Sequence, residues 1–298
     1  MSLSVGLVID ALLAGILTGG VYALMASGLT LVFGVLEIVN VAQGIFVILG
    51  AYLSYALNQY LHMDIFLTLL ITMPAMFLLG LLIEWAFVRR LKQDQNRVML
   101  SVLVMFAVAL VIEGLLNIIF SPDQVTLHAS YIDTSWSIVG GFYLPYVRVF
   151  FFLMSIVLLT GLYFLVYRTQ FGYSLRASMQ NRIAAELIGI DVKKVSMLTF
   201  AIGVALTAAG GMAYGAANLF NAASSYDLIS RLLVIIVLGG MGSLRGAFWG
   251  AMTMLIVKDL TTVFWGPQWS STVFFVTLVV LLVFRPQGLF GQLGGRKQ

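Results

Sequence analysis

Residues 98–120 read VMLSVLVMFAVALVIEGLLNIIF, and this stretch decides what kind of protein the chain is. Its only charged residue is Glu113, and apolar side chains fill almost every other position. A helix rises about 1.5 Å per residue, so about 20 apolar residues cross the roughly 30 Å hydrocarbon layer of a bilayer. The stretch therefore predicts a membrane-spanning helix.

The composition of the whole chain agrees with this interpretation. Of its 298 residues, 61% are hydrophobic and 9% are charged, and the mean hydropathy is +1.04. A soluble surface needs roughly a quarter to a third of its residues charged, which this chain does not supply. The lack of cysteine excludes disulfides, thiolate metal sites and a cysteine nucleophile. We therefore expect an integral membrane protein that is not an enzyme, with no catalytic residue and no metal site.

Apolar stretches of spanning length recur along the chain. Counted at about 20 residues per crossing, further spans cover about residues 5–33, 41–57, 65–88, 146–167, 195–217 and 269–284. The first 35 residues contain no lysine or arginine, whereas a secretory signal begins with a basic region, so we interpret the first stretch as a retained span. The sequence predicts one all-α transmembrane domain over residues 1–298, a polytopic bundle of about eight to ten segments.

One apolar region, residues 232–257, is interrupted by Gly239-Gly240-Met241-Gly242-Ser243-Leu244-Arg245-Gly246. Each half has about 12 to 15 residues, or roughly 18 to 22 Å of helix, which is too short to cross alone. We expect a discontinuous or re-entrant element here. Its free backbone groups either line a substrate path, or they form a tight cytoplasmic turn with Arg245 reaching the lipid headgroups.

The basic residues indicate the orientation. They gather in two loops and at the C-terminus, at Arg89, Arg90, Lys92 and Arg97, at Arg168, Arg176, Arg182, Lys193 and Lys194, and at Arg285, Arg296 and Lys297. Together with Arg245, 13 of the 16 basic residues then lie on one side, and the other side holds Arg148, Arg231 and Lys258. The acidic residues expected in the outer loops are Asp64, Asp123, Asp133, Asp227 and Asp259. Because basic loops face the cytoplasm, we expect a bacterial cytoplasmic (inner) membrane protein with its C-terminus inside and, with nine segments, its N-terminus outside.

Two longer loops remain. The outer loop, residues 121–145, has an alternating pattern that predicts a short hairpin. The inner loop, residues 168–194, predicts a short helix over residues 182–188, capped by Asn181 and ended by Gly189. At 27 residues it is far longer than a simple connection. This favours docking of a cytoplasmic partner, the alternative being an amphipathic helix on anionic lipid.

Polar residues within the spans are candidates for function. Asn40 and Gln43 are three residues apart and share a helix face, and Gly44 allows a close neighbour. One interpretation is that they form a wall or gate of a translocation path. The other is that their hydrogen bonds only hold helices together. A carboxylate inside a span, such as Glu113, which has Asn117 one turn away, could couple a cation in a secondary transporter. Without a second acidic or histidine partner, it supports that function only weakly.

Several blocks resemble LivH-type permeases for branched-chain amino acids. Ala184-Ala185-x-x-x-Gly189 is similar to the core of the EAA loop of ABC importer permeases, although Ile183 stands where that motif has Glu and its Ile-x-Leu-Pro portion is absent. The resemblance to the LivH-type family extends in order over nearly the whole chain, in 40–44 (NVAQG), 49–52 (LGAY), 171–177 (FGYSLRA), 184–190 (AAELIGI), 239–243 (GGMGS), Gly246-Ala247, Gly250-Ala251 and 285–291 (RPQGLFG).

This resemblance implies the pore subunit of a heteromeric, ATP-driven importer for branched-chain or related small amino acids. Its partners are then a second related permease, two cytoplasmic ATPases and a periplasmic or lipid-anchored binding protein, besides membrane lipid and no nucleic acid. ATP belongs to the ATPases, because the chain lacks a P-loop motif and so carries no cofactor itself. The alternative is a gradient-driven secondary transporter or channel.

The candidate site residues fall into two groups. The translocation path is assigned to Asn40, Gln43, Gly44, Gly239, Gly240 and Gly242, and ATPase coupling to Arg176, Ala184, Ala185, Glu186 and Gly189. If Ala185 lies in an ATPase groove, Ala185→Arg should abolish uptake while the protein remains inserted in the membrane.

Overall fold

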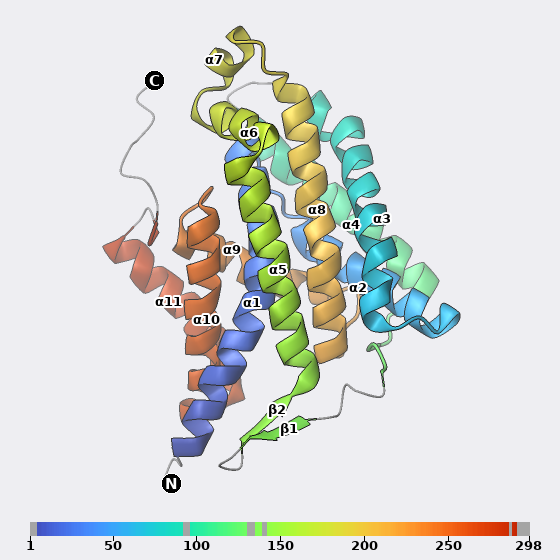
Figure 1. The fold of residues 1–298 in the computed structure, drawn as a ribbon, viewed down its shortest axis with the longest axis vertical. Coiled ribbons are helices and arrows are strands. Elements are labelled where there is room, and N and C mark those ends of the chain that lie inside the picture. The colour runs from blue at the N-terminus through green and yellow to red at the C-terminus, as the bar shows by residue number, and fades with distance from the viewer. Residues whose placement is uncertain (1–4, 92–95, 130–134, 139–141, 286–287, 291–298) are drawn as a thin grey trace.

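A computed structural model describes residues 5–91, 96–129, 135–138, 142–285 and 288–290. It is an elongated helical bundle (Figure 1). The long helices are α1 (Val5–Leu36), α2 (Gln43–Leu61), α3 (Ile65–Ala86), α4 (Arg97–Phe120), α5 (Tyr146–Arg168), α8 (Val192–Ala217), α9 (Ser224–Gly239), α10 (Leu244–Trp265) and α11 (Ser270–Phe284). Within the described residues, eight helical segments are long and apolar enough to cross a membrane, α9 not being among them. The predicted all-α polytopic membrane fold is confirmed.

The two ends of the bundle differ in what they carry. Helices α6 (Gln170–Gln180) and α7 (Arg182–Leu187) lie at one end, here named the basic end. Strands β1 (Ser135–Ile138) and β2 (Phe142–Pro145) lie at the other, the hairpin end, beside the start of α1 (Figure 1). The strands pair antiparallel, which confirms the predicted hairpin. Some residues that the sequence analysis used for the orientation or the C-terminal motif lie outside the described residues. They are Lys92, Asp133, Pro286, Gln287, Gly291, Arg296 and Lys297.

The core is built from long helices that pack on one another in pairs. Helix α1 packs along α10, and α8 packs along α3, while α2 packs on α9. Helices α1 and α8 cross where Gly28 faces Gly203, whose carbonyl oxygen lies 2.6 Å from where a Cβ on Gly28 would be. Small residues at such crossings let helix backbones approach closely, which is how helices associate in a membrane. This inner layer contains most of the buried side chains, and 83% of the spanning window of α8 is buried.

Two short non-helical segments interrupt this core. Residues 37–42 join α1 to α2, and residues 218–223 join α8 to α9. Ile38, Asn40 and Ala42 in the first segment and Phe220 and Ala222 in the second are each 0% exposed. Irregular backbone at membrane depth persists only when it is buried in protein or lines a cavity. The first segment meets that condition through Ile38, Asn40 and Ala42, whereas Asn218, Leu219 and Ala223 of the second segment are exposed.

The interrupted region differs from the sequence prediction in two ways. Helix α9 begins at Ser224 rather than near residue 232, and α10 has 22 residues, which is long enough to cross by itself. The expectation that both halves are too short is therefore wrong for α10. The predicted loop residues Asp227 and Arg231 lie within α9, and Lys258 and Asp259 within α10, because these charges pair inside the helices (Arg231 Nε to Asp227 Oδ2, 2.9 Å; Lys258 Nζ to Asp259 Oδ1, 3.0 Å).

Candidate translocation path and partner surface

The turn between α1 and α2 places Asn40 and Gln43 in the middle of the bundle. The Asn40 amide Nδ2 donates to Gln43 Oε1 at 3.0 Å, and Gln43 Nε2 donates to the Met25 carbonyl at 3.4 Å. Both side chains are 0% exposed, and Asn40 Oδ1 is buried without a hydrogen-bond partner among the described residues. The pair thus bonds α2 to α1 and still has one unused acceptor.

The depth of this pair follows from its neighbours. Gln43 Nε2 lies 3.0 Å from where a Cβ on Gly28 would be, and Gly28 in turn faces Gly203. Gly28 is about two turns from the end of α1 and Gly203 about three turns from the start of α8, or roughly 12 and 17 Å. Asn40 and Gln43 therefore lie several turns in from the ends of α1 and α8 at the basic end.

Gly44 explains how α2 and α9 meet beside this pair. A Cβ on Gly44 would overlap the carbonyl oxygen of Ser225 and lie 3.0 Å from Ile229 Cβ. The first turns of α2 and α9 are therefore in backbone contact next to Asn40 and Gln43. Three of the predicted path residues thus form one closed, buried junction.

A second polar turn at the start of α9 was missed by the sequence analysis. Asn221 Oδ1 accepts from the backbone N–H of Ser224 and from its hydroxyl, both at 3.2 Å, and Ser224 Oγ accepts from the Asn221 N–H at 3.2 Å. This reciprocal pair holds the turn that leads into α9. The signal in the sequence was the likeness of Asn221-Ala222-Ala223-Ser224 to Asn40-Val41-Ala42-Gln43.

The glycine-rich break lies at the basic end, away from the Asn40 junction. Gly240 and Gly242 adopt φ angles of +97° and +85°, and Ser243 Oγ accepts from the Gly246 N–H at 3.1 Å to begin α10. A Cβ on Gly242 would lie 3.7 Å from Gly34 Cα, near the end of α1. Gly239 and Gly246 are in backbone contact. Of the two alternatives, this geometry is that of a tight turn between α9 and α10.

The C-terminal segment completes the end of α9. The Leu289 N–H donates to the Leu238 carbonyl at 2.7 Å, and the Phe290 N–H donates to the Gly239 carbonyl at 3.1 Å. Gly288, at φ +78°, brings the chain against Gly240. Carbonyls at a helix end need such partners, so part of the C-terminal motif acts as a structural cap.

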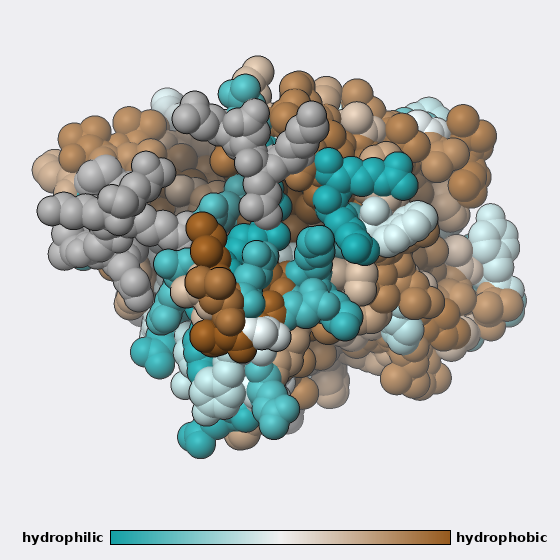
Figure 2. Space-filling view, turned by 90° about the horizontal axis from the view of Figure 1, so that it is seen from above, coloured by the Kyte–Doolittle hydropathy of each residue, from teal (hydrophilic) through white to brown (hydrophobic). Residues whose placement is uncertain are grey.

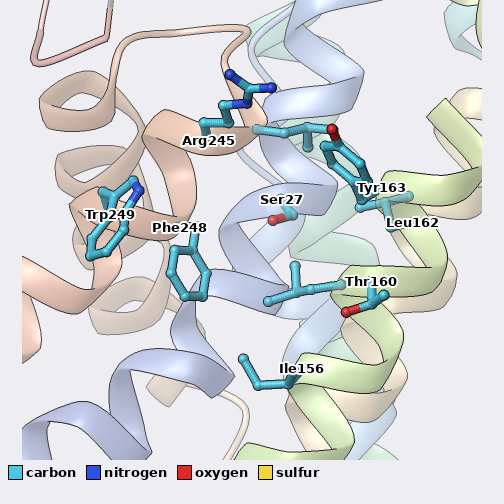
Figure 3. Close-up of a pocket in the computed structure, with 10 residues that line it drawn as sticks. Ser27, Ile156, Thr160, Leu162, Tyr163, Arg245, Phe248 and Trp249 are labelled. Atoms are coloured by element: carbon cyan, nitrogen blue, oxygen red, sulfur yellow. The ribbon is translucent and has the colours of Figure 1, made fainter. Parts of the chain in front are cut away.

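A cavity of about 340 Å³ opens between α1, α5 and α10 in the half nearer the basic end. Figure 3 shows Phe248 and Trp249 on one side, Ile156 and Thr160 on the other, and Arg245 near the top. Its lining is mostly apolar, and the Arg245 guanidinium lies at its basic end. Such a lining suits an aliphatic molecule that carries an anionic group.

Glu113 has a partner in the structure. The Tyr226 hydroxyl donates to Glu113 Oε2 at 2.5 Å, which joins α4 to α9. No cluster of three acidic, histidine or cysteine side chains that could hold a metal ion occurs in the described ranges. The carboxylate of Glu113 is thus held by a helix-to-helix hydrogen bond.

Helix α6 is tied to the end of α5 by Arg176. Its guanidinium donates to the Val166 carbonyl and lies over the rings of Tyr167 and Tyr173, at 5.2 and 4.8 Å. A cation over aromatic faces with a carbonyl partner is well held. Arg176, expected at the ATPase contact, therefore positions α6 on its own chain.

Helix α7 has the caps predicted from the sequence. Asn181 Oδ1 accepts from the Ala184 N–H at 3.0 Å, and Gly189 ends the helix at φ +89°. Glu186 Oε1 lies 3.4 Å from Arg182 Nε. Ala184 and Glu186 are exposed, in line with a partner surface.

Ala185 is placed differently from the expectation. It is 2% exposed and packs within this chain, because a six-residue helix turned onto the bundle must bury one face. Its outer face instead carries the apolar tip, which we define as Ile183, Leu187 and Ile188, exposed by 72%, 83% and 75%. Ala185→Arg would therefore disturb this chain's own packing. Figure 2 views this end of the molecule and shows hydrophobic side chains in the midst of hydrophilic ones.

Comparison with known proteins identifies the family of this chain. The family described as "Branched-chain amino acid transport system / permease component" matches residues 11–282. The chain belongs to this permease family. The permease is 26% identical to the high-affinity branched-chain amino acid transport system permease protein BraD of Pseudomonas aeruginosa, over 95% of this chain and 96% of BraD.

Other relatives agree on the type of permease. A probable branched-chain amino acid transport permease protein LivH of Methanocaldococcus jannaschii is 27% identical over 93% of this chain and 90% of its own length. A LivM permease of Salmonella typhimurium is 26% identical over 90% of this chain but 67% of its own length. The permease is thus of the LivH type. No solved structure matches it.

Proposed function

We propose that this permease is a pore subunit of an ATP-driven ABC importer for branched-chain or related small amino acids. The relatives are named as permease proteins of branched-chain amino acid transport systems, and both LivH and LivM types occur among them. A second, LivM-like permease would complete the pore. Two cytoplasmic ATPases would bind the ATP, and a periplasmic or lipid-anchored protein would deliver the amino acid.

The observation that carries the proposal is the apolar tip of α7. Helix α7 is the part of the molecule that projects farthest at the basic end (Figure 1), beyond α6. A helix held on the membrane surface would lie level with the ends of the spans, whereas Ile183, Leu187 and Ile188 point from a projecting tip. An apolar helix face of this kind fits a groove in a partner protein.

The orientation belongs to the proposal as well. With the basic end in the cytoplasm, α7 faces the ATPases, the C-terminus is cytoplasmic, and the hairpin end faces the binding protein. The protein would then reside in the bacterial cytoplasmic membrane. ATPase movement would be transmitted through α7 and α6 to the bundle, opening the junction at Asn40, Gln43 and Gly44.

The test is co-purification of the tagged chain followed by ATP-dependent leucine uptake in proteoliposomes. The wild-type chain should retain two ATPases and a second permease. Leu187→Asp should release the ATPases and reduce uptake by at least about tenfold, because a charged side chain replaces an apolar contact in the groove. Leu219→Asp changes a residue 61% exposed near the hairpin end and serves as the matched control.

Two outcomes would contradict the proposal. Retention of the ATPases by Leu187→Asp, with uptake at the wild-type rate, would remove the coupling role of α7. A chain that purifies alone and transports along an ion gradient without ATP would favour the secondary transporter instead.

A further inference from the structure

A second cavity, of about 170 Å³, lies in the half of the bundle nearer the hairpin end. Helices α1, α5, α8 and α10 form its walls, and Arg148, Lys258 and Asp259 supply charges to its lining. Pockets for drug-sized ligands have about 300–1,000 Å³, so this one suits a smaller molecule. We name it the outer cavity.

Two charges of the outer cavity lie where charge is costly, whereas Arg148 is exposed near the start of α5. Lys258 and Asp259 are within spanning helix α10, about two turns or roughly 10 Å before its end at Trp265. Their side chains are 24% and 17% exposed. Ionisable residues at such positions almost always face protein or a water-filled cavity and mark a transport path.

Both signs of charge are present, with an excess of one cation. Lys258 Nζ lies 3.0 Å from Asp259 Oδ1, and this pair is neutral overall. Arg148, near the start of α5, forms no ion pair with any described residue. A guanidinium can hold a carboxylate through two parallel hydrogen bonds, and the Asp259 carboxylate can accept from an ammonium group.

The remaining wall of the outer cavity combines apolar side chains with the polar side chains of Thr18, Tyr22, Tyr214 and Asn218. Leu17, Val21 and Met25 lie on one face of α1, and Phe151 and Ala213 come from α5 and α8. The carbonyl of Met25 accepts from Gln43 Nε2. The outer cavity therefore ends one hydrogen bond away from the closed Asn40 junction.

We propose that the outer cavity binds a zwitterionic aliphatic amino acid on its way to the Asn40 junction. The α-carboxylate binds Arg148, the α-ammonium binds Asp259 beside Lys258, and the side chain contacts Val21, Met25 and Phe151. This inference rests on the proposed function and gives the permease its own recognition of the amino-acid backbone. A phospholipid with an ethanolamine headgroup carries the same two charges, so the test must separate these two sources.

The test uses the intact transporter in nanodiscs of phosphatidylglycerol, which contain no ethanolamine lipid. Radiolabelled L-leucine should bind saturably to the transporter without its binding protein. Leucinamide and 4-methylpentanoate, which lack the carboxylate and the ammonium respectively, should compete at least about tenfold less well than leucine. Asp259→Asn and Arg148→Gln should weaken leucine binding by about tenfold or more, Asp259→Glu should restore part of it, and Lys194→Gln at the basic end should change nothing.

The outcomes separate this inference from the proposed function. ATP-driven leucine uptake with wild-type rate and KM in both Asp259→Asn and Arg148→Gln would overturn the inference and leave the importer intact. Co-purifying ethanolamine phospholipid that is lost in the variants, with leucine binding unchanged, would overturn it in favour of a lipid site. A wild-type complex that takes up no amino acid would overturn both.

Discussion

The two non-helical segments of the core have similar backbone turns. They differ in how many of their side-chain polar groups are hydrogen-bonded. In each, six residues follow a long helix, an asparagine turns the chain, and a new helix starts beyond it. The Gln43 N–H donates to the Asn40 carbonyl and the Ser224 N–H to the Asn221 carbonyl, both at 3.1 Å. Because α1 and α8 run in opposite directions, the two segments are inverted relative to each other, as in the inverted repeats of transporters.

The difference is in the side chains. The Asn221 and Ser224 side chains accept from each other's backbone N–H, and the Ser224 hydroxyl donates to Asn221 Oδ1, so both side-chain oxygens of that turn are hydrogen-bonded. Asn40 bonds only through its amide nitrogen to Gln43, and its oxygen is buried without a partner in the described residues. The same backbone turn thus serves once as an anchor and once as a polar site with unused hydrogen-bonding capacity.

The largest effect is expected where the helices that follow the two segments, α2 and α9, are in contact at their first turns. Gly44→Val would place side-chain atoms against the Ser225 carbonyl and Ile229, and a contact with backbone cannot relax cheaply. Overpacking typically costs about 1–3 kcal/mol, and a clash with backbone belongs at the upper end of that range. Most of the protein should be lost from the monodisperse fraction in size-exclusion chromatography. Gly114→Val is the control, since nothing lies within 4 Å of a Cβ there, and equal losses in both variants would contradict the close junction.

The comparison of the two asparagines predicts that replacing Asn221 mainly lowers stability, whereas replacing Asn40 mainly lowers the uptake rate. Asn221→Ala removes the two hydrogen bonds that Asn221 Oδ1 accepts in the turn before α9. It should cost about 1 kcal/mol, seen as a lower melting temperature with uptake per folded transporter retained. Asn40→Ala removes an acceptor that has no partner, which offsets part of the lost bond to Gln43. It should lower the melting temperature less and the uptake rate more, by about tenfold or more.

This prediction is checked by thermal unfolding and uptake assays on both variants in the same membranes. If Asn221→Ala slows uptake as much as Asn40→Ala at equal amounts of folded protein, the two turns have the same role. The distinction between anchor and transport site would then be wrong.

The smallest effect is expected at the helix cap formed by Asp191, outside the membrane. Asp191 begins α8, and the hydrogen bonds from the Lys194 N–H and side chain lower the pKa of this carboxyl. A lowered pKa means that the ionised form stabilises the helix above the ordinary value of about 3.9, and this contribution is lost as pH falls through the lowered pKa. Asp191→Asn keeps the cap and removes the charge, so it should flatten the pH dependence.

Amide hydrogen exchange over residues 192–196, measured between neutral pH and about pH 3, reads out this effect. Protection should fall at low pH in the wild type and stay nearly constant in Asp191→Asn, after correction for the intrinsic exchange rate. An unchanged pH dependence in the variant would show that Asp191 does not stabilise the start of α8. The effect is small because Asp191 is exposed to water, which screens its charge.

Much of the fold follows from counting apolar residues. The predicted starts at residues 65, 98 and 146 agree within one residue with those of α3, α4 and α5. The start of α9 was missed because Asp227 and Arg231 interrupt the apolar count, although they pair with each other one turn apart inside the helix. A hydropathy count treats each charge as exposed, whereas the structure neutralises them together.

The sites were less predictable. Asn40, Gln43 and Gly44 do come together, because they lie within one turn of the same helix start. A six-residue helix has too little periodicity to show which face is buried, so Ala185 was assigned to the wrong side. The outer cavity gives no local signal at all, since Arg148, Lys258 and Asp259 come from two helices that are far apart in the chain.

The cap on α9 has a consequence for the order in which the protein is made. The carbonyls of Leu238 and Gly239 receive their partners from Leu289 and Phe290, about fifty residues farther along the chain. At roughly 5–20 residues per second, a helix in the centre of the bundle waits several seconds during synthesis before its end is closed. The last carbonyls of α9 therefore gain these partners only after α10 and α11 have been translated.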